Sequence, residues 1–241
     1  MIDYRVYLVT DNPSRYAGNW LDNVRAAVEG GVTCVQYRDT ESPAKRQYER
    51  ILALRDAIGR VPIIVNNDAE LALAVHADGV HVGQGDLPPT AVRSIVGPGC
   101  EIGYSITDAC QLEAKSVEIE NSDCLGVGPV FDARKTKADA ARAMGIDGFL
   151  QIAAALPGYP LVAIGGITMQ NAADVISAGA CGLAVVSAFS KSDNPHAVAK
   201  AFRQLFDRRQ GTGLHPFGVP PCGIARQLKG FDIKSRDSVA G

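Results

Sequence analysis

The feature of this chain that most constrains its fold is the alternation of short apolar runs with longer amphipathic stretches. Eight runs rich in β-branched residues recur along the sequence, at residues 6–10, 32–38, 61–66, 79–82, 101–104, 124–127, 161–164 and 182–186. Because these runs are short and apolar, they suit strands that are buried on both faces. The pattern therefore predicts a parallel β-sheet of eight strands.

The stretches between these runs have the spacing of helices. One apolar stripe with helical spacing is formed by Trp20, Leu21, Val24, Ala27 and Val28. Ser42 and Pro43 predict the N-cap and first turn of a further helix. Eight strand–helix units fit a closed barrel better than an open doubly wound sheet. We therefore predict an α/β protein with a single (β/α)8 barrel over residues 1–207.

The C-terminal segment, residues 208–241, does not continue this pattern. It contains six glycines and three prolines and shows little apolar periodicity. We interpret it as a poorly ordered tail. A lid or a partner-binding extension stays open as the functional alternative.

The charge and cysteine patterns exclude several classes of protein. With 24 basic and 26 acidic side chains, the formal net charge is -2, which argues against a broad nucleic-acid-binding surface. The first residues carry Asp3, Arg5 and Asp11 and resemble neither a signal peptide nor a membrane anchor, so we expect a cytoplasmic enzyme. The six cysteines form no C-x-x-C pair, and we interpret most of them as small core residues. Whether the chain forms a homo-oligomer stays open.

Polar residues lie at or just after the C-terminal ends of several predicted strands, at the end of the barrel where active sites lie. We expect them to face one shared pocket, and they include Gln36, Arg38, Asn66, Asp86 and Ser105. Arg38 could bind a phosphate through its planar guanidinium group. Asp86 could bind Mg²⁺, or it could be the N-cap of a helix near Pro88.

A phosphate site is expected after the last two strands. Gly165 and Gly166 follow the seventh run, and Ser187 follows the eighth. Glycine allows backbone N–H groups to approach an anion closely, although a tight turn alone would also need glycine. Lys137, in the loop of residues 132–144, could add a positive charge or could be a solvated surface residue.

His81 lies inside a predicted strand, so we interpret it as structural and not as a general acid or base. The sequence displays neither a Ser/His/Asp nor a Cys/His set. These observations predict a pocket that holds phosphates and neutralises a departing charge, without nucleophilic attack by the protein.

Six segments together resemble the thiamine-phosphate synthase family. They are V-T-C-V-Q-Y-R at 32–38, I-I-V-N-N-D-A-E-L-A-L at 63–73, A-D-G-V-H-V-G-Q-G-D at 77–86, G-V-G-P-V-F with T-K at 126–137, V-A-I-G-G-I-T at 162–168 and A-V-V-S-A at 184–188. The resemblance covers residues 6–206. It implies a transferase of thiamine biosynthesis that joins hydroxymethylpyrimidine diphosphate to a thiazole phosphate, releasing pyrophosphate, with Mg²⁺ as cofactor. It also implies that pyrophosphate departs first and leaves a pyrimidine methyl cation, which the thiazole nitrogen captures.

The resemblance also assigns roles to individual residues. Binding of the pyrimidine diphosphate falls to Gln36, Arg38, Thr40, Asn66, Ser105 and Lys137, of which Arg38, Ser105 and Lys137 are the catalytic candidates. Contacts to the thiazole phosphate fall to Thr136, Gly166, Val186 and Ser187. The metal ligands are Asn67 and Asp86.

Three positions depart from the family pattern. Thr40 stands where a lysine is frequent, Asn67 replaces an aspartate, and residues 132–135 replace a threonine-containing segment. Two other functions therefore stay open: a thiazole tautomerase-like paralogue that does not use the pyrimidine diphosphate, and a non-catalytic sensor of thiazole phosphate.

Overall fold

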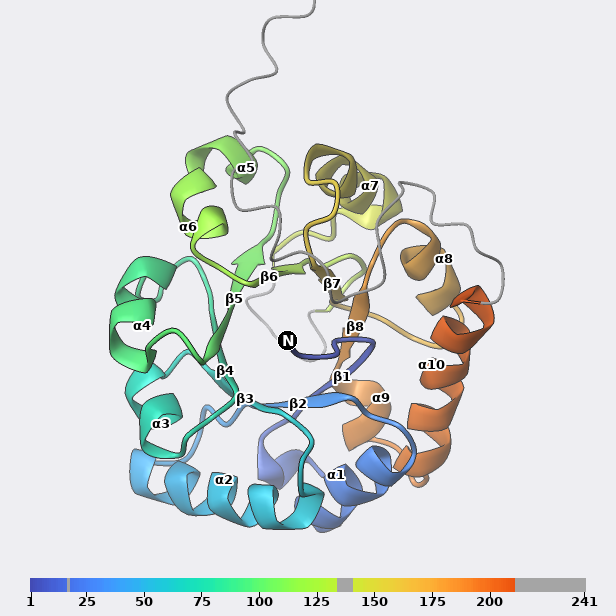
Figure 1. Cartoon of the computed structure of the whole chain (residues 1–241). Helices are drawn as coiled ribbons and strands as arrows, with labels where there is room; N and C mark the ends of the chain where they lie inside the picture. The colour runs from blue at the N-terminus through green and yellow to red at the C-terminus, as the bar shows by residue number, and fades with distance from the viewer. Residues whose placement is uncertain (17, 134–140, 211–241) are drawn as a thin grey trace, which may run out of the picture.

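The centre of the molecule is a closed barrel of eight parallel strands, seen in a computed structural model that describes residues 1–16, 18–133 and 141–210. Each strand pairs with the next one along the chain, and β8 pairs with β1, so that the sheet closes on itself (Figure 1). The strands are β1 Val6–Val9, β2 Cys34–Tyr37, β3 Ile63–Asn66, β4 Gly79–Val82, β5 Glu101–Ile106, β6 Cys124–Val127, β7 Leu161–Ile164 and β8 Gly182–Val185. The predicted (β/α)8 fold is confirmed.

Every predicted run holds one of these strands, and the differences lie at the strand ends. One strand, β5, is longer than predicted and continues past the expected end at Tyr104 to Ile106. The reason is pairing with β6, where Ser105 is opposite Gly126 and Ile106 is opposite Val127. Ser105 is therefore held within a strand instead of in the loop that follows.

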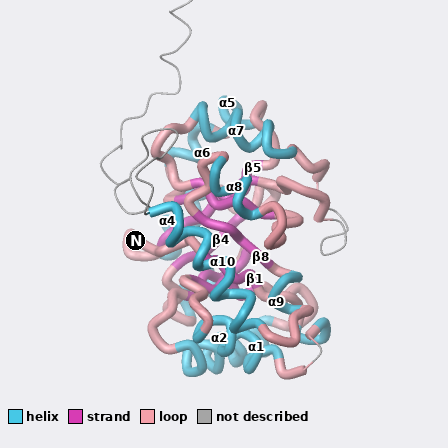
Figure 2. The backbone as a smooth tube through the Cα atoms, turned by 90° about the vertical axis from the view of Figure 1, so that its right-hand side faces the viewer, coloured by secondary structure: helices cyan, strands magenta, loops and turns pink. Residues whose placement is uncertain are grey.

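Helices surround the barrel on its outside (Figures 1 and 2). They are η1 Pro13–Arg15, α1 Trp20–Glu29, α2 Ala44–Ile58, α3 Ala69–Ala74, α4 Pro89–Val96, α5 Gln111–Ala114, α6 Ser116–Glu120, α7 Gly145–Ala155, α8 Ala172–Ser177, α9 Ser187–Ser190 and α10 Pro195–Gln210. The last helix, α10, packs against α1 and α9, so the first and last units of the barrel meet. Among the described residues, none of these helices has the length and apolar content needed to span a bilayer.

The expected domain boundary falls inside the last helix. α10 continues to Gln210, past the predicted boundary at residue 207. The proposed tail lies almost entirely outside the described residues, as does Cys222.

The start of α2 differs from the sequence prediction. Ser42 is not the N-cap, because Pro43 occupies that position and makes no side-chain hydrogen bond there. The amides that precede the helix are satisfied instead by Asp39, whose Oδ1 accepts from the N–H groups of Glu41 and Ser42 at 3.0 Å each. A carboxylate at the end of β2 thus replaces the expected serine cap, and the Ser42 hydroxyl accepts from Arg50.

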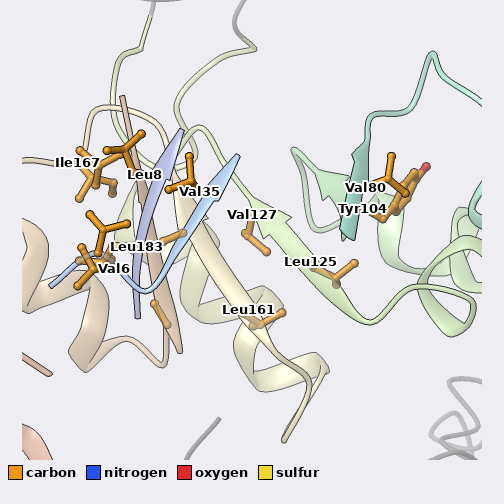
Figure 3. Close-up of a cluster of buried hydrophobic side chains, with 14 of the residues drawn as sticks. Val6, Leu8, Val35, Val80, Tyr104, Leu125, Val127, Leu161, Ile167 and Leu183 are labelled. Atoms are coloured by element: carbon orange, nitrogen blue, oxygen red, sulfur yellow. The ribbon is translucent and has the colours of Figure 1, made fainter. Parts of the chain in front are cut away.

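The apolar core has two layers, one on each face of the barrel wall. Side chains that point outward from the strands form the outer layer together with the helices, among them Val6, Leu8 and Val35 (Figure 3). Alternate residues of the same strands, such as Tyr7 and Cys34, form a smaller cluster inside the barrel. This is the two-residue alternation of a β-strand. Polar residues at inward positions therefore enter the barrel interior.

Three cysteines, Cys34, Cys100 and Cys124, are buried, as predicted for small core residues. Cys181 is half-buried and Cys110 is exposed. Most of the cysteines in the described part of the chain thus contribute to packing.

The barrel is filled at the end where its strands begin. Ile2 and Tyr4 are buried there with the inner cluster, and the N-terminal segment enters the ring of strands (Figure 1). The carboxylate of Glu101 accepts hydrogen bonds from the Ile2 N–H at 2.9 Å and from the Tyr4 hydroxyl at 2.7 Å. Burial raises the pKa of Tyr4 well above its ordinary value, so the phenol stays protonated and remains a donor.

Inward-pointing residues are more exposed at the opposite end, where the strands finish. Asn66, His81, Ser105 and Ile164 are each half-buried, whereas inner residues nearer the strand starts, such as Cys34, are fully buried. The polar rim at the C-terminal ends of the strands is therefore the accessible end of the barrel, where active sites of this fold lie.

Candidate active site

Arg38 follows β2 at the rim, and its backbone is held by the neighbouring strand. The Arg38 N–H donates to Thr10 Oγ1 at 2.8 Å, and the Thr10 hydroxyl donates back to the Arg38 carbonyl at 3.0 Å. The Arg38 side chain is half-buried, and its guanidinium group has no hydrogen-bond or ion-pair partner within the described residues. A fixed backbone with an unpaired guanidinium group is suited to binding an anion.

Gln36, the inward residue just before Arg38, is buried and held from within the barrel. Its Nε2 donates to the Tyr7 hydroxyl at 2.8 Å. Burial raises the pKa of Tyr7 well above its ordinary value, so this hydroxyl stays protonated. The side-chain amide of Gln36 is therefore held in a fixed orientation at the rim.

Thr40 is exposed and is tied to the loop after β1. Its N–H donates to Asn12 Oδ1 at 2.9 Å, and its hydroxyl lies 3.3 Å from the same oxygen. The Asn12 amide in turn donates to Glu41 Oε1 at 2.7 Å. The contacts of Thr40 in the described structure are therefore those of a loop-to-loop link.

The polar residues after β3 have different partners. Asp68 is the N-cap of α3 and accepts from the Leu71 N–H at 2.8 Å. Asn67 has a left-handed backbone with φ of 62°, a region that asparagine tolerates better than most residues. Its N–H donates to the His81 carbonyl at 2.8 Å. The side-chain amides of Asn66 and Asn67 form no hydrogen bond with the described residues.

Asp86 closes a turn in the loop after β4. Its Oδ2 accepts from the Gly83 N–H at 2.7 Å. The alternative interpretation of Asp86 as a helix cap is wrong, because α4 begins at Pro89 with Pro88 as its N-cap. Oδ1 of Asp86 makes no hydrogen bond with the described residues. In the described ranges, no three His, Cys, Asp or Glu side chains gather into a metal-binding cluster.

Ser105 and His81 form a pair on the inner face of β4 and β5. His81 Nε2 lies 2.9 Å from Ser105 Oγ. Burial lowers the pKa of His81 to about 4, so the imidazole is neutral near pH 7. This contact was not predicted, because the sequence does not give the register that places the two residues together.

The loops after β6 and β7 lie against each other. The Val130 N–H donates to the Ile164 carbonyl at 2.9 Å, and the Phe131 N–H donates to the Gly165 carbonyl at 3.0 Å. Gly166 has φ of 63°, and a Cβ at this position would lie 2.7 Å from Phe131 Cβ. The loop packing itself therefore requires glycine at 166.

The neighbouring strand end contributes unpaired amides to the same part of the rim. β7 and β8 pair with each other, and the short helix α9 begins at Ser187 directly after β8. Within the described residues, the N–H groups of Gly166 and Ser187 donate to no acceptor. Val186, the N-cap of α9, is half-buried beside them. These amides are free to bind an anion such as a phosphate.

Two of the predicted site residues, Thr136 and Lys137, lie outside the described residues. Of the remainder, Gln36, Asn66 and Ser105 belong to strands β2, β3 and β5, and Arg38 directly follows β2. The predictions did not include Thr10 and Tyr7, which support Arg38 and Gln36. Strand alternation places Tyr7 on an inner face, but the partner that it meets depends on register.

Comparisons with known proteins agree with each other. The family model described as "Thiamine monophosphate synthase" matches residues 6–189. The thiamine-phosphate synthase of Chloroflexus aurantiacus is 42% identical over 216 residues, covering 89% of this chain and 98% of that protein. The enzyme of the same name from Albidiferax ferrireducens is 42% identical, covering 84% and 92%.

Solved structures give the same picture. The thiamine phosphate pyrophosphorylase of Pyrococcus furiosus superposes with a TM-score of 0.75 at 30% identity, covering 86% of this chain and 96% of that one. A protein of the same name from Bacteroides thetaiotaomicron, with a TM-score of 0.60 at 18% identity, shares the fold.

Proposed function

The chain belongs to the thiamine monophosphate synthase family, and we propose that the polar rim of its barrel is the active site for the family reaction. The protein is a transferase that joins hydroxymethylpyrimidine diphosphate to a thiazole phosphate, giving thiamine phosphate and pyrophosphate. The observation that carries this function is the 42% identity to a thiamine-phosphate synthase across 98% of that enzyme. We further propose that the enzyme acts in the cytoplasm on these small molecules.

The diphosphate group binds beside β2, β3 and β5 in this proposal. Arg38 supports this assignment best, because its guanidinium group is unpaired and its backbone is fixed by Thr10. Gln36, Asn66 and Ser105 point inward at the same rim and add neutral hydrogen-bonding groups. Lys137 supplies a further positive charge to the leaving group. Such groups stabilise the negative charge that develops as the bond to the diphosphate breaks.

We assign a Mg²⁺ ion to Asp86 and Asn67, which follow the neighbouring strands β4 and β3. The donor set fits this ion, because Asp86 Oδ1 and the Asn67 amide oxygen have no other partner among the described residues and are hard oxygen ligands. Mg²⁺ is commonly held by one or two carboxylates, with substrate phosphates and water completing its shell. When bound, the ion would neutralise part of the diphosphate charge.

The thiazole phosphate binds at the other side of the rim in this proposal. The N–H groups of Gly166 and Ser187 support the assignment, because both lack an acceptor in the described structure and belong to adjacent strand ends. Val186 and Thr136 complete this subsite. Two phosphate sites at one barrel end hold the reacting carbon of one substrate near the ring nitrogen of the other. Positioning of this kind can supply a large part of a rate enhancement.

The protein donates no electrons to the new bond in this scheme. The bond between the pyrimidine methylene carbon and the diphosphate oxygen breaks, and the thiazole nitrogen supplies the electron pair of the new carbon–nitrogen bond. Thr40 and Asn67 remove one positive and one negative charge relative to the family pattern. These two losses cancel, so the combined net charge of the metal site and the diphosphate site is the same as in the family pattern. The charge of each site taken alone is different.

A coupled assay tests the proposal. The full chain is mixed with both substrates and Mg²⁺, and thiamine phosphate and pyrophosphate are both measured. We expect the two products in equal amounts. Binding of the thiazole phosphate without either product would instead support a sensor, and isomerisation of the thiazole alone would support a tautomerase-like enzyme.

A further inference from the structure

The imidazole of His81 occupies a prepared space inside the barrel. It extends from β4 across the adjacent strands β5 and β6, where the facing residues are Gly103 and Gly126. A Cβ on Gly103 would lie 2.3 Å from His81 Nδ1, and a Cβ on Gly126 would lie 2.8 Å from His81 Cε1. Both separations are well below any real carbon contact, so neither strand can carry a side chain here while the ring keeps its position.

The ring places polar nitrogen atoms in a space that an apolar side chain could fill without leaving any polar atom unsatisfied. His81 is half-buried, and the part of its ring that is withdrawn from water is unfavourable unless it is hydrogen-bonded. The bond that compensates it is the 2.9 Å contact between Nε2 and Ser105 Oγ at the rim. The glycines on β5 and β6 therefore leave the room that the His81 ring needs to reach Ser105, which is a proposed substrate-binding residue.

We infer that His81 is a positioning residue, which fixes the direction of the Ser105 hydroxyl at the rim through the Nε2–Oγ bond. The inference rests on the proposed function, because Ser105 is assigned there to the pyrimidine diphosphate. A serine hydroxyl rotates freely about its Cβ–Oγ bond when it has no partner. The neutral ring can bond Oγ as donor or acceptor, and either bond leaves the remaining hydrogen-bonding capacity of Oγ pointing to substrate.

A kinetic double-mutant cycle separates this role from a purely structural one. His81→Leu removes the bond, His81→Gln restores a polar atom near the position of Nε2, and Ser105→Ala removes the partner. We expect His81→Leu to lower kcat/KM about tenfold in the parent and less than about twofold in the Ser105→Ala background. His81→Gln should stay within about threefold of the parent. An equal loss from His81→Leu in both backgrounds would overturn the inference.

Substitution of Gly126, one of the two glycines that face the His81 ring, tests the same geometry without altering His81 or Ser105. Gly126→Ala should push the ring away from Ser105 and reproduce the kinetic loss of His81→Leu. Thermal unfolding of each variant shows whether it is folded. A folded Gly126→Ala protein with the activity of the parent would contradict the role given to the ring position.

A measurement that needs no turnover distinguishes failure of this inference from failure of the proposed function. In protein labelled with ¹⁵N-histidine, Ser105→Ala should shift the ring nitrogen signal of His81, whereas Ser94→Ala, at an exposed serine of α4, should not. Unchanged signals in Ser105→Ala would overturn the positioning role even in an active enzyme. If the parent made no thiamine phosphate, the proposed function would fail, and the signals would still decide whether His81 holds Ser105.

Discussion

Replacing Thr10 by valine isolates the support that β1 gives to Arg38. Thr10 is 1% exposed, and its hydroxyl both accepts from the Arg38 N–H and donates to the Arg38 carbonyl. Valine keeps the shape of the side chain and removes only the hydroxyl. The Arg38 N–H then loses its partner in a partly buried site, and the residue that carries the guanidinium group is less firmly fixed.

The chain contains a matched control at the opposite end of the same two strands. Thr33, just before β2, accepts from the Val6 N–H at 3.0 Å and donates to the Val6 carbonyl at 3.1 Å. Thr33→Val therefore removes the same pair of bonds far from the rim. Leaving one backbone donor unpaired costs about 1–3 kcal/mol in either variant. For a domain of this size, that loss lowers Tm by roughly 2–12 °C.

The two variants should differ in catalysis. Thr10→Val should raise the KM for hydroxymethylpyrimidine diphosphate about tenfold, since a charge-assisted bond contributes about 1.5–3 kcal/mol and only part of it is lost. Thr33→Val should leave that KM within about twofold of the parent. Calorimetry gives Tm, and initial rates at varied substrate give KM. If both variants lose stability and neither changes KM, the conclusion that Thr10 positions Arg38 for binding is wrong.

Four further predictions follow from the same structure. Arg38→Lys should lose most of the diphosphate affinity despite keeping its charge, because lysine cannot form the planar bidentate contact; equal KM values for parent and variant would place Arg38 outside the site. Asn67→Asp should lower the Mg²⁺ concentration that gives half-maximal rate, and superimposed titration curves would remove Asn67 from the metal shell. Gly166→Val should lower Tm, because its Cβ would meet Phe131 and its φ is 63°; an unchanged Tm in calorimetry would show that the loop packing tolerates a side chain at this position. Burial alone would raise the pKa of Asp39, but hydrogen bonds from neighbouring amides and side chains outweigh it and lower the pKa, so its stabilisation is present above the unfolded pKa and is lost as pH falls through the folded value; Asp39→Asn should flatten the acid limb of a plot of unfolding free energy against pH.

The strands were predictable because each is an apolar run of the length that a doubly buried strand needs. The apolar stripe of α1, which begins at Trp20, was predictable for the same reason of periodicity. The N-cap of α2 was not, because the side chain that satisfies its preceding amides is Asp39, which the sequence places in the preceding strand–loop segment. Asp39 precedes these amides by only two and three residues, so the contact is local, of a kind that aspartate commonly makes in turns. The Ser42–Pro43 pattern pointed to the wrong residue.

The strand ends that carry the candidate site could be predicted from the sequence. The hydrogen-bonded pairs that its side chains form could not. Gln36 and Ser105 could be assigned to the rim because one lies near the end of an apolar run and the other directly follows one. Their partners, Tyr7 and His81, are inward residues on neighbouring strands, and pairing of this kind depends on register, which one sequence does not contain. Asp86 was open to interpretation as a helix cap for a different reason, because aspartate is common both at helix N-caps and in tight turns, such as the one that Asp86 closes on the Gly83 N–H.

Ile2, Tyr4 and Glu101 fill the end of the barrel where the strands begin, and this affects the route that substrates and products can take. In the described part of the chain, the starting end of the strands is filled by the inner cluster. If the rim binds both substrates as proposed, both arrive and both products leave on that one side of the barrel. Each of these molecules can then obstruct the passage of the others.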